Sequence, residues 1–438
     1  MLIFRINYFL LPTEIWIVVT TTIVIWITRI YLNSFLALRK GKVKERKPST
    51  AVLHGSEPLV SIILPTYNES RVIGRLLSAV TKIDYRNFEV IVADDSTDGK
   101  TMEVLGQWQE KGIRVIHRDS RKGFKAGALN NAMLHISPKS EYILIFDADY
   151  VPQKEIIWQM LGDFSSKEIA AVQGYTKHTL NASKNIWTKA VSIGFSAYSL
   201  VDIPIRKKLN GFIPLFGSVT MVSRQALSEV NGFSEDSITE DYELACKLEA
   251  CGYSIMFDEG IAVPAECPDS FRVLLKQQMR WAEGITRDTK NHLRRLLSSK
   301  KLNLMKKFDY VYYGFSSLNG IIGTAAYSLT AFVFMVQHHL ILHSLGVDST
   351  FVTALGPYGN FLLNVAPGYV ALGLISMVIV GLYREGRLHD VLWVAYFYLV
   401  TLLLAPFIAI SGIRGLLLKK GSWSRTKKTG EVIREVHP

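Results

Sequence analysis

Short apolar runs alternate with amphipathic stretches from Pro58 onward, and this alternation limits the possible folds more than any other feature of the sequence. An apolar run of four to eight residues is typical of a buried strand, and longer amphipathic stretches are typical of helices. The alternation predicts a mostly parallel, doubly wound α/β sheet. We expect strands at residues 59–64, 88–93, 113–116, 142–146, 170–173, 216–222 and 253–257. We expect helices at residues 70–82, 101–110, 125–136, 185–201 and 241–250.

Two carboxylates follow the fourth predicted strand, in the order Asp147, Ala148, Asp149. Ligands collect at the carboxyl edge of such a sheet. Two anions held close together repel each other unless a cation lies between them, and carboxylate oxygens favour Mg²⁺ or Mn²⁺. That cation would in turn bind phosphate oxygens. The alternative is two surface acids in an ordinary turn.

Further candidate residues follow the first two strands. Pro65 and Tyr67 can form a flat wall for a nucleobase, and Glu69 can accept hydrogen bonds from a base or ribose. Asp94 and Asp95 lie where an acid can accept hydrogen bonds from ribose hydroxyls or a base. Each segment is also a plausible helix-capping turn. The chain has neither G-x-G-x-x-G after its first strand nor a P-loop, which argues against a dinucleotide cofactor and a P-loop NTPase.

Three later motifs carry charged or aromatic groups. Lys125 and Gly127 open a predicted helix whose N-terminus suits phosphate. Thr239 and the acids Glu240 and Asp241 form a good capping sequence before another helix. The third motif lies on a basic amphipathic stretch at residues 270–301, which predicts a helix in a membrane interface. Its Arg and Trp can anchor the helix in that interface, or contact a pyrophosphate and a sugar face; the motif residues are Gln277, Arg280 and Trp281.

The two ends of the chain are strongly apolar. Residues 15–36 are long enough to cross a bilayer and lack a small-residue cleavage site, which predicts a retained membrane anchor. Six Lys or Arg follow at residues 39–47, and six more follow Leu418. This distribution of the net charge of +12 indicates a cytoplasmic membrane surface, and we expect no nucleic-acid partner.

Three apolar segments lie near the C-terminus, at residues 310–337, 361–383 and 391–418. The loop at 338–360 has no Lys or Arg and is expected outside, whereas the loop at 384–390 is expected in the cytoplasm. Pro406 and Gly412 predict that the last segment is broken, re-entrant or interfacial. The expected division is 1–38 anchor, 39–57 basic linker, 58–268 catalytic domain, 269–307 interface helices, 308–418 transmembrane or re-entrant helices, and 419–438 basic cytosolic tail.

The ordered set D-D, D-x-D, T-E-D and Q-x-x-R-W resembles the inverting family 2 glycosyltransferases, nearest the cellulose synthase-like and mannan synthase-like branch. The resemblance covers about residues 58–290. It implies a GT-A fold, a Rossmann-like nucleotide-diphospho-sugar transferase domain, in the cytosol, together with an α-helical transmembrane region. Phe216, Gly217 and Ser218 resemble that branch's acceptor segment without its cysteine. Trp423, Thr426 and Lys428 partly match its gating loop, but Arg425 replaces the valine, so we do not count them as site residues.

The resemblance implies a role for each matching residue. Asp94 and Asp95 would contact the nucleoside, and Asp147 and Asp149 would hold Mg²⁺ or Mn²⁺ with the diphosphate. Asp241 would be the general base. Arg280 would stabilise the departing diphosphate, and Trp281 would pack against the acceptor together with the T-E-D acid Glu240.

The sequence therefore predicts a multi-pass membrane hexosyltransferase that uses a nucleotide-diphosphate sugar, with GDP-mannose and UDP-glucose both credible. We expect a lipid-linked sugar or glycan as acceptor, because three or four spans are few for a polysaccharide channel. A processive polysaccharide synthase with coupled secretion is the main alternative, since Q-x-x-R-W is typical of polymerising enzymes. A non-catalytic membrane scaffold is the alternative from another class.

Overall fold

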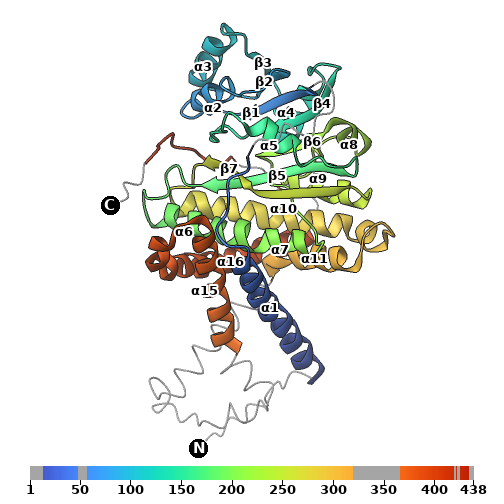
Figure 1. The fold of residues 1–438 in the computed structure, drawn as a ribbon, viewed down its shortest axis with the longest axis vertical. Helices are drawn as coiled ribbons and strands as arrows, with labels where there is room; N and C mark the ends of the chain where they lie inside the picture. The colour runs from blue at the N-terminus through green and yellow to red at the C-terminus, as the bar shows by residue number, and fades with distance from the viewer. Residues whose placement is uncertain (1–12, 48–56, 319–365, 419–420, 422–424, 434–438) are drawn as a thin grey trace, which may run out of the picture.

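The computed structural model describes residues 13–47, 57–318, 366–418, 421 and 425–433. Its centre is one seven-stranded sheet with the order β3-β2-β1-β4-β6-β5-β7 (Figure 1). The strands are β1 (Leu59–Thr66), β2 (Phe88–Asp94), β3 (Arg114–His117), β4 (Ser140–Ile145), β5 (Ile169–His178), β6 (Thr220–Ser223) and β7 (Ser254–Ala265).

The sheet is mostly parallel, as predicted, but it is mixed because one of its seven strands, β6, runs against the others. Strands β3, β2, β1 and β4 are parallel, but β6 runs antiparallel to both of its neighbours, β4 and β5. The strand predicted at 216–222 starts only at Thr220. Gly217 and Val219 adopt positive φ angles of 70° and 54°, which are incompatible with a strand, so the residues before Thr220 form a loop.

The parallel half of the sheet is buried on both faces, as its continuous apolar strands require. On β1, Ile62 and Leu64 pack with Leu76 of α2 (Ile73–Val80) in one apolar cluster. Ile63 points the other way and packs with Leu129 of α4 (Phe124–Met133). The remaining helices of this half are α3 (Gly99–Gln109) and α5 (Ile156–Leu161).

A layer of helices lies beneath the β5 and β7 half of the sheet (Figure 1). Its longest member is α10 (Phe271–Ser298), which spans the amphipathic stretch predicted from the sequence. The layer also contains α6 (Ile186–Ala197), which continues through a single π-type turn (Tyr198–Asp202) into α7 (Ile203–Lys208), and α11 (Leu304–Gly314). The short helix α8 (Arg224–Glu229) follows β6, and α9 (Glu240–Ala250) precedes β7.

Two helices extend side by side away from the sheet, α1 (Thr13–Arg39) and α15 (Ala366–Glu385) (Figure 1). The Tyr31 hydroxyl of α1 donates to the Tyr369 carbonyl of α15 at 3.1 Å. Gly373 brings the helices close, because a Cβ there would be 3.2 Å from the Tyr31 ring. The predicted anchor is thus helical and packs on a C-terminal helix.

The C-terminal apolar segment forms α16 (Val394–Leu417), preceded by a turn of tighter helix (Leu388–Trp393). The predicted break is wrong, because α16 continues through Pro406 and Gly412. Among the described residues, the stretch Leu388–Leu417 is the one that is long and apolar enough to cross a membrane. Most of the segment at 310–337 and the loop at 338–360 lie outside the described residues, so the multi-helix transmembrane region stays a prediction.

Candidate active site

Two hollows meet at the carboxyl edge of β1 and β4. The outer hollow has a volume of about 150 Å³ and lies over the loops that follow these strands. The inner cavity has a volume of about 480 Å³ and extends from that edge between α6, α10 and α16. Six residues line both, namely Asp147, Phe216, Asp241, Gln277, Trp281 and Lys428. These six residues form the junction, where a molecule in the outer hollow would meet a molecule in the inner cavity.

The predicted base-binding residues line the outer hollow. Pro65, Tyr67 and Glu69 come from the end of β1 and the turn after it. The Arg121 guanidinium lies 3.4 Å from the centroid of the Tyr67 ring, a cation–π contact that fixes the plane of the ring. Burial raises the pKa of Glu69 to about 8, although the nearby Arg425 and Lys428 oppose the shift.

The two acids after β2 have different surroundings. Asp95 lines the outer hollow, and Arg118 grips it with two hydrogen bonds of 2.7 and 2.6 Å. Asp94 does not line either hollow in the described structure; it is 2% exposed and bonds to His117 Nδ1 at 2.7 Å and to the Ser96 amide. The Asp94 carboxylate holds the end of β3 in this structure, and its nucleoside contact stays a prediction.

Asp147 and Asp149, which follow β4, differ in exposure and in their partners. Asp147 is 38% exposed and pairs with Lys125 Nζ at 2.7 Å. Asp149 is 1% exposed, and its Oδ2 accepts from Lys428 Nζ at 2.7 Å and from the Glu266 amide at 3.1 Å. Its other oxygen, Oδ1, is buried without a hydrogen-bond partner. Such an orphaned acceptor costs free energy unless a donor or a cation reaches it.

These two carboxylates fit a divalent cation that takes its remaining ligands from elsewhere. They supply hard oxygen donors one residue apart, and Asp149 Oδ1 has an open coordination position. No group of three or more His, Cys, Asp or Glu within the described part of the chain has a metal-binding arrangement. Water and phosphate oxygens of a ligand would complete the coordination.

Lys125, on the first turn of α4, contacts the loop after β4, the start of α9 and the loop before β6. Its ammonium contacts Asp147, lies 3.4 Å from Glu240 and donates to the Gly217 carbonyl at 2.8 Å. Burial alone would lower the pKa of Lys125, but the surrounding carboxylates raise it, so the ammonium keeps its charge. Gly127 does not line either described hollow, so its ligand contact stays a prediction; a Cβ there would collide with the Lys122 carbonyl oxygen.

The acids Glu240 and Asp241 begin α9 at the junction. Burial raises the pKa of Asp241 to about 7; Glu240 adds to this effect, and Lys125 opposes it. A carboxylate with a pKa near neutral pH suits proton transfer. Thr239 precedes the helix, but its side chain does not cap it; the hydroxyl donates instead to Asp288 on α10 at 2.7 Å.

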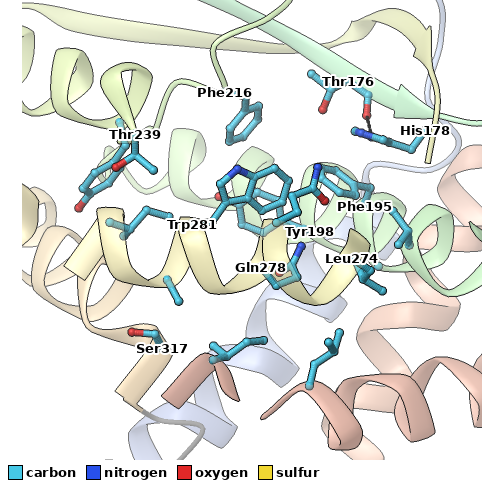
Figure 2. A pocket seen from close by; sticks show the side chains of 18 of the residues that line it. Thr176, His178, Phe195, Tyr198, Phe216, Thr239, Leu274, Gln278, Trp281 and Ser317 are labelled. Atoms are coloured by element: carbon cyan, nitrogen blue, oxygen red, sulfur yellow. Dashed lines mark hydrogen bonds between the residues drawn. The ribbon is translucent and has the colours of Figure 1, made fainter. Parts of the chain in front are cut away.

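Gln277, Arg280 and Trp281 come from one face of α10. Arg280 lines the outer hollow and donates to the Ile238 carbonyl at 3.0 Å. Burial lowers its pKa, and the carboxylates of Glu240, Asp241 and Asp147 oppose the shift, so this guanidinium faces the same acids. Figure 2 shows Trp281 reaching from α10 into the inner cavity, with Phe216 on the opposite wall. The Gln277 Oε1 atom is buried without a hydrogen-bond partner.

The loop at residues 216–219, before β6, lines the junction and holds its side chains in place. Phe216 lines both hollows, whereas Ser218 is fully buried and accepts a 3.0 Å hydrogen bond from the Asp147 amide. Ser218 therefore positions Asp147 in this structure, and its acceptor contact stays a prediction. Gly217 is packed between the Asp241 carboxylate and the Lys125 ammonium. Gln173 on β5, which the sequence did not single out, holds this loop through the Phe216 amide and the Ser218 and Val219 carbonyls.

Three residues of the C-terminal tail line the outer hollow, namely Arg425, Thr426 and Lys428, and sequence reasoning did not count them as site residues. Arg425 pairs with Glu69 at 3.2 Å, and Lys428 pairs with Asp149. The amides of Thr429 and Gly430 donate to Glu266 Oε2. The sequence signal that could have pointed to these residues was the partial match to the gating loop. Trp423 lies outside the described residues.

The comparisons with known proteins agree with this geometry. The family model described as "Glycosyltransferase like family 2" matches residues 57–284, more than half of the 438 residues. The chain belongs to glycosyltransferase family 2. The predicted resemblance is confirmed, and its cellulose synthase-like branch is supported by the relatives that follow.

This family 2 chain is 28% identical over 277 residues to glucomannan 4-beta-mannosyltransferase 7 of Arabidopsis thaliana, covering 61% of this chain and 50% of that protein. It is 29% identical over 286 residues to probable glucomannan 4-beta-mannosyltransferase 9 of Oryza sativa subsp. japonica, covering 63% and 54%. The chain thus spans about half the length of these curated relatives. The solved structure of mannosyltransferase PcManGT from Pyrobaculum calidifontis, in complex with GDP-Man and Mn²⁺, has a TM-score of 0.54 at 17% identity, covering 91% of this chain and 98% of that one. This likeness shows a shared fold.

Proposed function

We propose that this family 2 chain transfers a hexose, with inversion, from a nucleotide-diphosphate sugar to an acceptor hydroxyl at the cytosolic face of a membrane. The observation that carries the proposal is the junction, where Asp147, Lys125, Asp241 and Trp281 meet between an outer hollow and an inner cavity. The donor would occupy the outer hollow, and the acceptor would enter from the inner cavity.

The outer hollow has the groups that a nucleotide-diphosphate sugar needs. Tyr67 offers a ring for the base, and Asp95 offers acceptor oxygens. Arg280, Lys125 and Lys428 supply positive charge for the diphosphate. Asp147 and Asp149 would hold Mg²⁺ or Mn²⁺, which supplies Lewis-acid stabilisation of the charge that develops on the leaving diphosphate.

Asp241 would act as the general base. The acceptor oxygen forms the new bond to the anomeric carbon while the bond from that carbon to the diphosphate oxygen breaks. The hydroxyl proton passes to Asp241, and the electron pair leaves with the nucleoside diphosphate. A single displacement inverts the anomeric configuration and needs no covalent nucleophile. The Asp241 carboxylate has a pKa of about 7, so it is substantially ionised at neutral pH and can accept the proton.

GDP-mannose is the favoured donor and UDP-glucose the second choice. Support for mannose comes from the relatives, which are named glucomannan 4-beta-mannosyltransferases, and from PcManGT, which was solved with GDP-Man and Mn²⁺. Those relatives also favour the second candidate function, elongation of a β-linked glycan. A non-catalytic scaffold is disfavoured, because it has no need for an acid with a pKa near neutral beside a charged lysine.

A transfer assay tests the proposal. The full chain in lipid nanodiscs is incubated with GDP-mannose or UDP-glucose, glycoside acceptors, and Mn²⁺, Mg²⁺ or EDTA, and nucleoside diphosphate release is measured. We expect release that requires a divalent cation. Asp241→Asn should abolish transfer while largely keeping donor binding by calorimetry, whereas Asp149→Ala should weaken donor binding itself.

The matched control is Asp236→Asn, which changes an exposed acid and should behave as wild type. Release that is absent with every donor, or that is the same in Asp241→Asn as in wild type, would contradict the proposal. Products sized by mass spectrometry separate the two candidate functions, since a single added hexose indicates one-step transfer and a long ladder indicates polymer synthesis.

A further inference from the structure

The inner cavity changes character along its length. Near the junction its walls are polar and aromatic, with Asp241, Gln277, His178 and Trp281. Farther in, seven apolar side chains from α6, α10 and α16 line it, namely Ala190, Val191, Leu274, Phe397, Val400, Leu404 and Ile408. We call these seven residues the apolar end.

The polar end has the features of a sugar subsite. Trp281 and Phe216 offer ring faces from opposite walls (Figure 2). Gln277 Oε1 is buried and lacks a hydrogen-bond partner, so it can accept from a hydroxyl of a bound molecule. His178 Nδ1 bonds to the Thr176 carbonyl at 3.1 Å, and burial lowers the pKa of His178 to about 4, so the ring stays neutral. A neutral His in this tautomer keeps Nε2 as an acceptor.

The apolar end does not suit a further sugar. Five of its residues belong to one buried apolar cluster, and the other two, Phe397 and Ile408, pack against that cluster. None of the seven carries a hydrogen-bonding side chain, and the hydroxyl of Thr401, which lines the cavity beside them, donates to the Phe397 carbonyl at 2.8 Å. Most sugar hydroxyls placed there would therefore lose their water without replacement. Hydrocarbon in the same place removes apolar surface from water and gains contact with the walls.

The position of α16 connects the apolar end with lipid. The helix belongs to the stretch that is long and apolar enough to cross a membrane. Its outer face is exposed and apolar, with Leu399 at 53% and Ile410 at 54% exposure, whereas Val400 and Leu404 are buried on the cavity side. α6 and α16 approach closely at Gly194, where a Cβ would lie 2.9 Å from the Phe397 ring. Among the described residues, α16 thus lies between the cavity and an exposed apolar surface that lipid would cover.

We infer that the acceptor carries a hydrocarbon chain, alkyl or polyprenyl, which lies in the apolar end while the acceptor hydroxyl reaches Asp241. The inference rests on the proposed function and specifies its acceptor class. The occupant is one continuous molecule with a sugar head between Trp281 and Phe216 and a tail between α6, α10 and α16. The hydrocarbon tail takes no part in bond making or bond breaking, so it contributes only to binding and orientation of the acceptor.

Matched glycosides test the inference. The full chain in nanodiscs is assayed for kcat/KM with octyl and methyl glycosides of mannose and glucose, at one donor and Mn²⁺ concentration. Burial of each additional methylene favours binding, so we expect the octyl compounds to react at least about tenfold more efficiently than the methyl compounds. Leu404→Trp fills the apolar end and should remove most of that preference, with little change for the methyl glycosides.

Two further variants keep the test independent of folding. Ala190→Phe narrows the same end from α6 and should have the same selective effect. Leu399→Trp adds the same bulk on the exposed face of α16 and should leave both activities unchanged. Equal kcat/KM for octyl and methyl glycosides in the wild type, or equal losses for both in Leu404→Trp, would overturn the inference while leaving the proposed function intact. Absence of metal-dependent turnover with every acceptor would overturn both.

Discussion

The charge on Lys125 should set the pH at which the proposed base becomes active. Asp241 must be ionised to accept a proton, so kcat/KM should rise with pH through about 7, the pKa of its carboxyl. Lys125 Nζ and Asp241 Oδ2 lie 2.9 and 2.8 Å from the point that a Gly217 Cβ would occupy. Their separation is therefore below about 6 Å. The lysine favours the ionised carboxylate, and its removal should raise the pKa of Asp241.

The size of the effect follows from Coulomb's law. Two unit charges about 6 Å apart interact by about 3 kcal/mol at an effective dielectric constant of about 20, which corresponds to about two pH units. Relaxation and water entry reduce this, so Lys125→Met should move the acid limb of the kcat/KM profile upward by about one to two pH units. The position of the limb does not depend on the absolute rate, which the substitution also lowers.

The assay is nucleoside diphosphate release from pH 5.5 to 9.5 at saturating Mn²⁺, with subsaturating donor and acceptor. Lys122→Met is the matched control, because its side chain is exposed three residues away. The control should keep the limb near pH 7. A limb that stays at the wild-type pH in Lys125→Met would refute the assignment of Asp241 as the base, or of Lys125 as the group that tunes it.

Three other substitutions test the packing that positions the site. Gly217→Ala should reduce kcat by about 10²-fold at an unchanged fold, measured by circular dichroism, because its φ of +70° and the 2.8 Å contact with Asp241 force that carboxylate to move. Gln173→Leu should lower the free energy of unfolding by about 1–3 kcal/mol, since it removes the acceptor of the partly buried Phe216 amide and of the buried Thr220 hydroxyl. Gln109→Leu on the surface should have no effect in the same denaturant titration. Asp309→Asn should cost about 3–5 kcal/mol in the same assay, because the buried Asp309 carboxylate pairs with both Arg206, at 2.9 Å, and Arg29. Among the described residues, its loss leaves Arg206 with Asp202 as its one carboxylate partner and Arg29 with none. The fully exposed Asp119→Asn is its control; equal stability of the two variants would contradict the reasoning.

The strands of the parallel half were predictable because their signal is local. A run such as Ile143–Phe146 has one stable placement, buried on both faces, whatever the rest of the chain does. The direction of β6 was not predictable in this way. It depends on the loop at residues 216–219, whose positive φ angles are held by contacts with Gln173 and Lys125, far away in sequence.

The acids of the site were predictable as a set, but their individual contacts were not. Asp94 and Asp95 are adjacent and chemically identical, yet one bonds to His117 and the other to Arg118 at the edge of the hollow. Asp94 ends β2 and is paired in register with His117 of β3, whereas Asp95 lies just beyond the strand. The register of β3 against β2 and the path of the chain after both strands therefore decide which partner each acid meets. Ser218 is a similar case, because its hydroxyl was predicted to meet ligand and supports Asp147 in this structure.

The cations that make the outer hollow suitable for a diphosphate come from distant parts of the chain. Each acid has its own partner: Lys125 for Asp147, Arg118 for Asp95, Arg425 for Glu69, and Lys428 for Asp149, 279 residues away. Acidic motifs alone would repel a ligand that carries two or three negative charges. With these partners in place, the proposed donor's diphosphate would meet Lys125, Lys428 and Arg280. These cations could exchange or share their carboxylate contacts with phosphate oxygens at little electrostatic cost. The D-x-D pattern therefore marks where such a ligand would bind, whereas the lysines and arginines brought there by the fold determine whether it can.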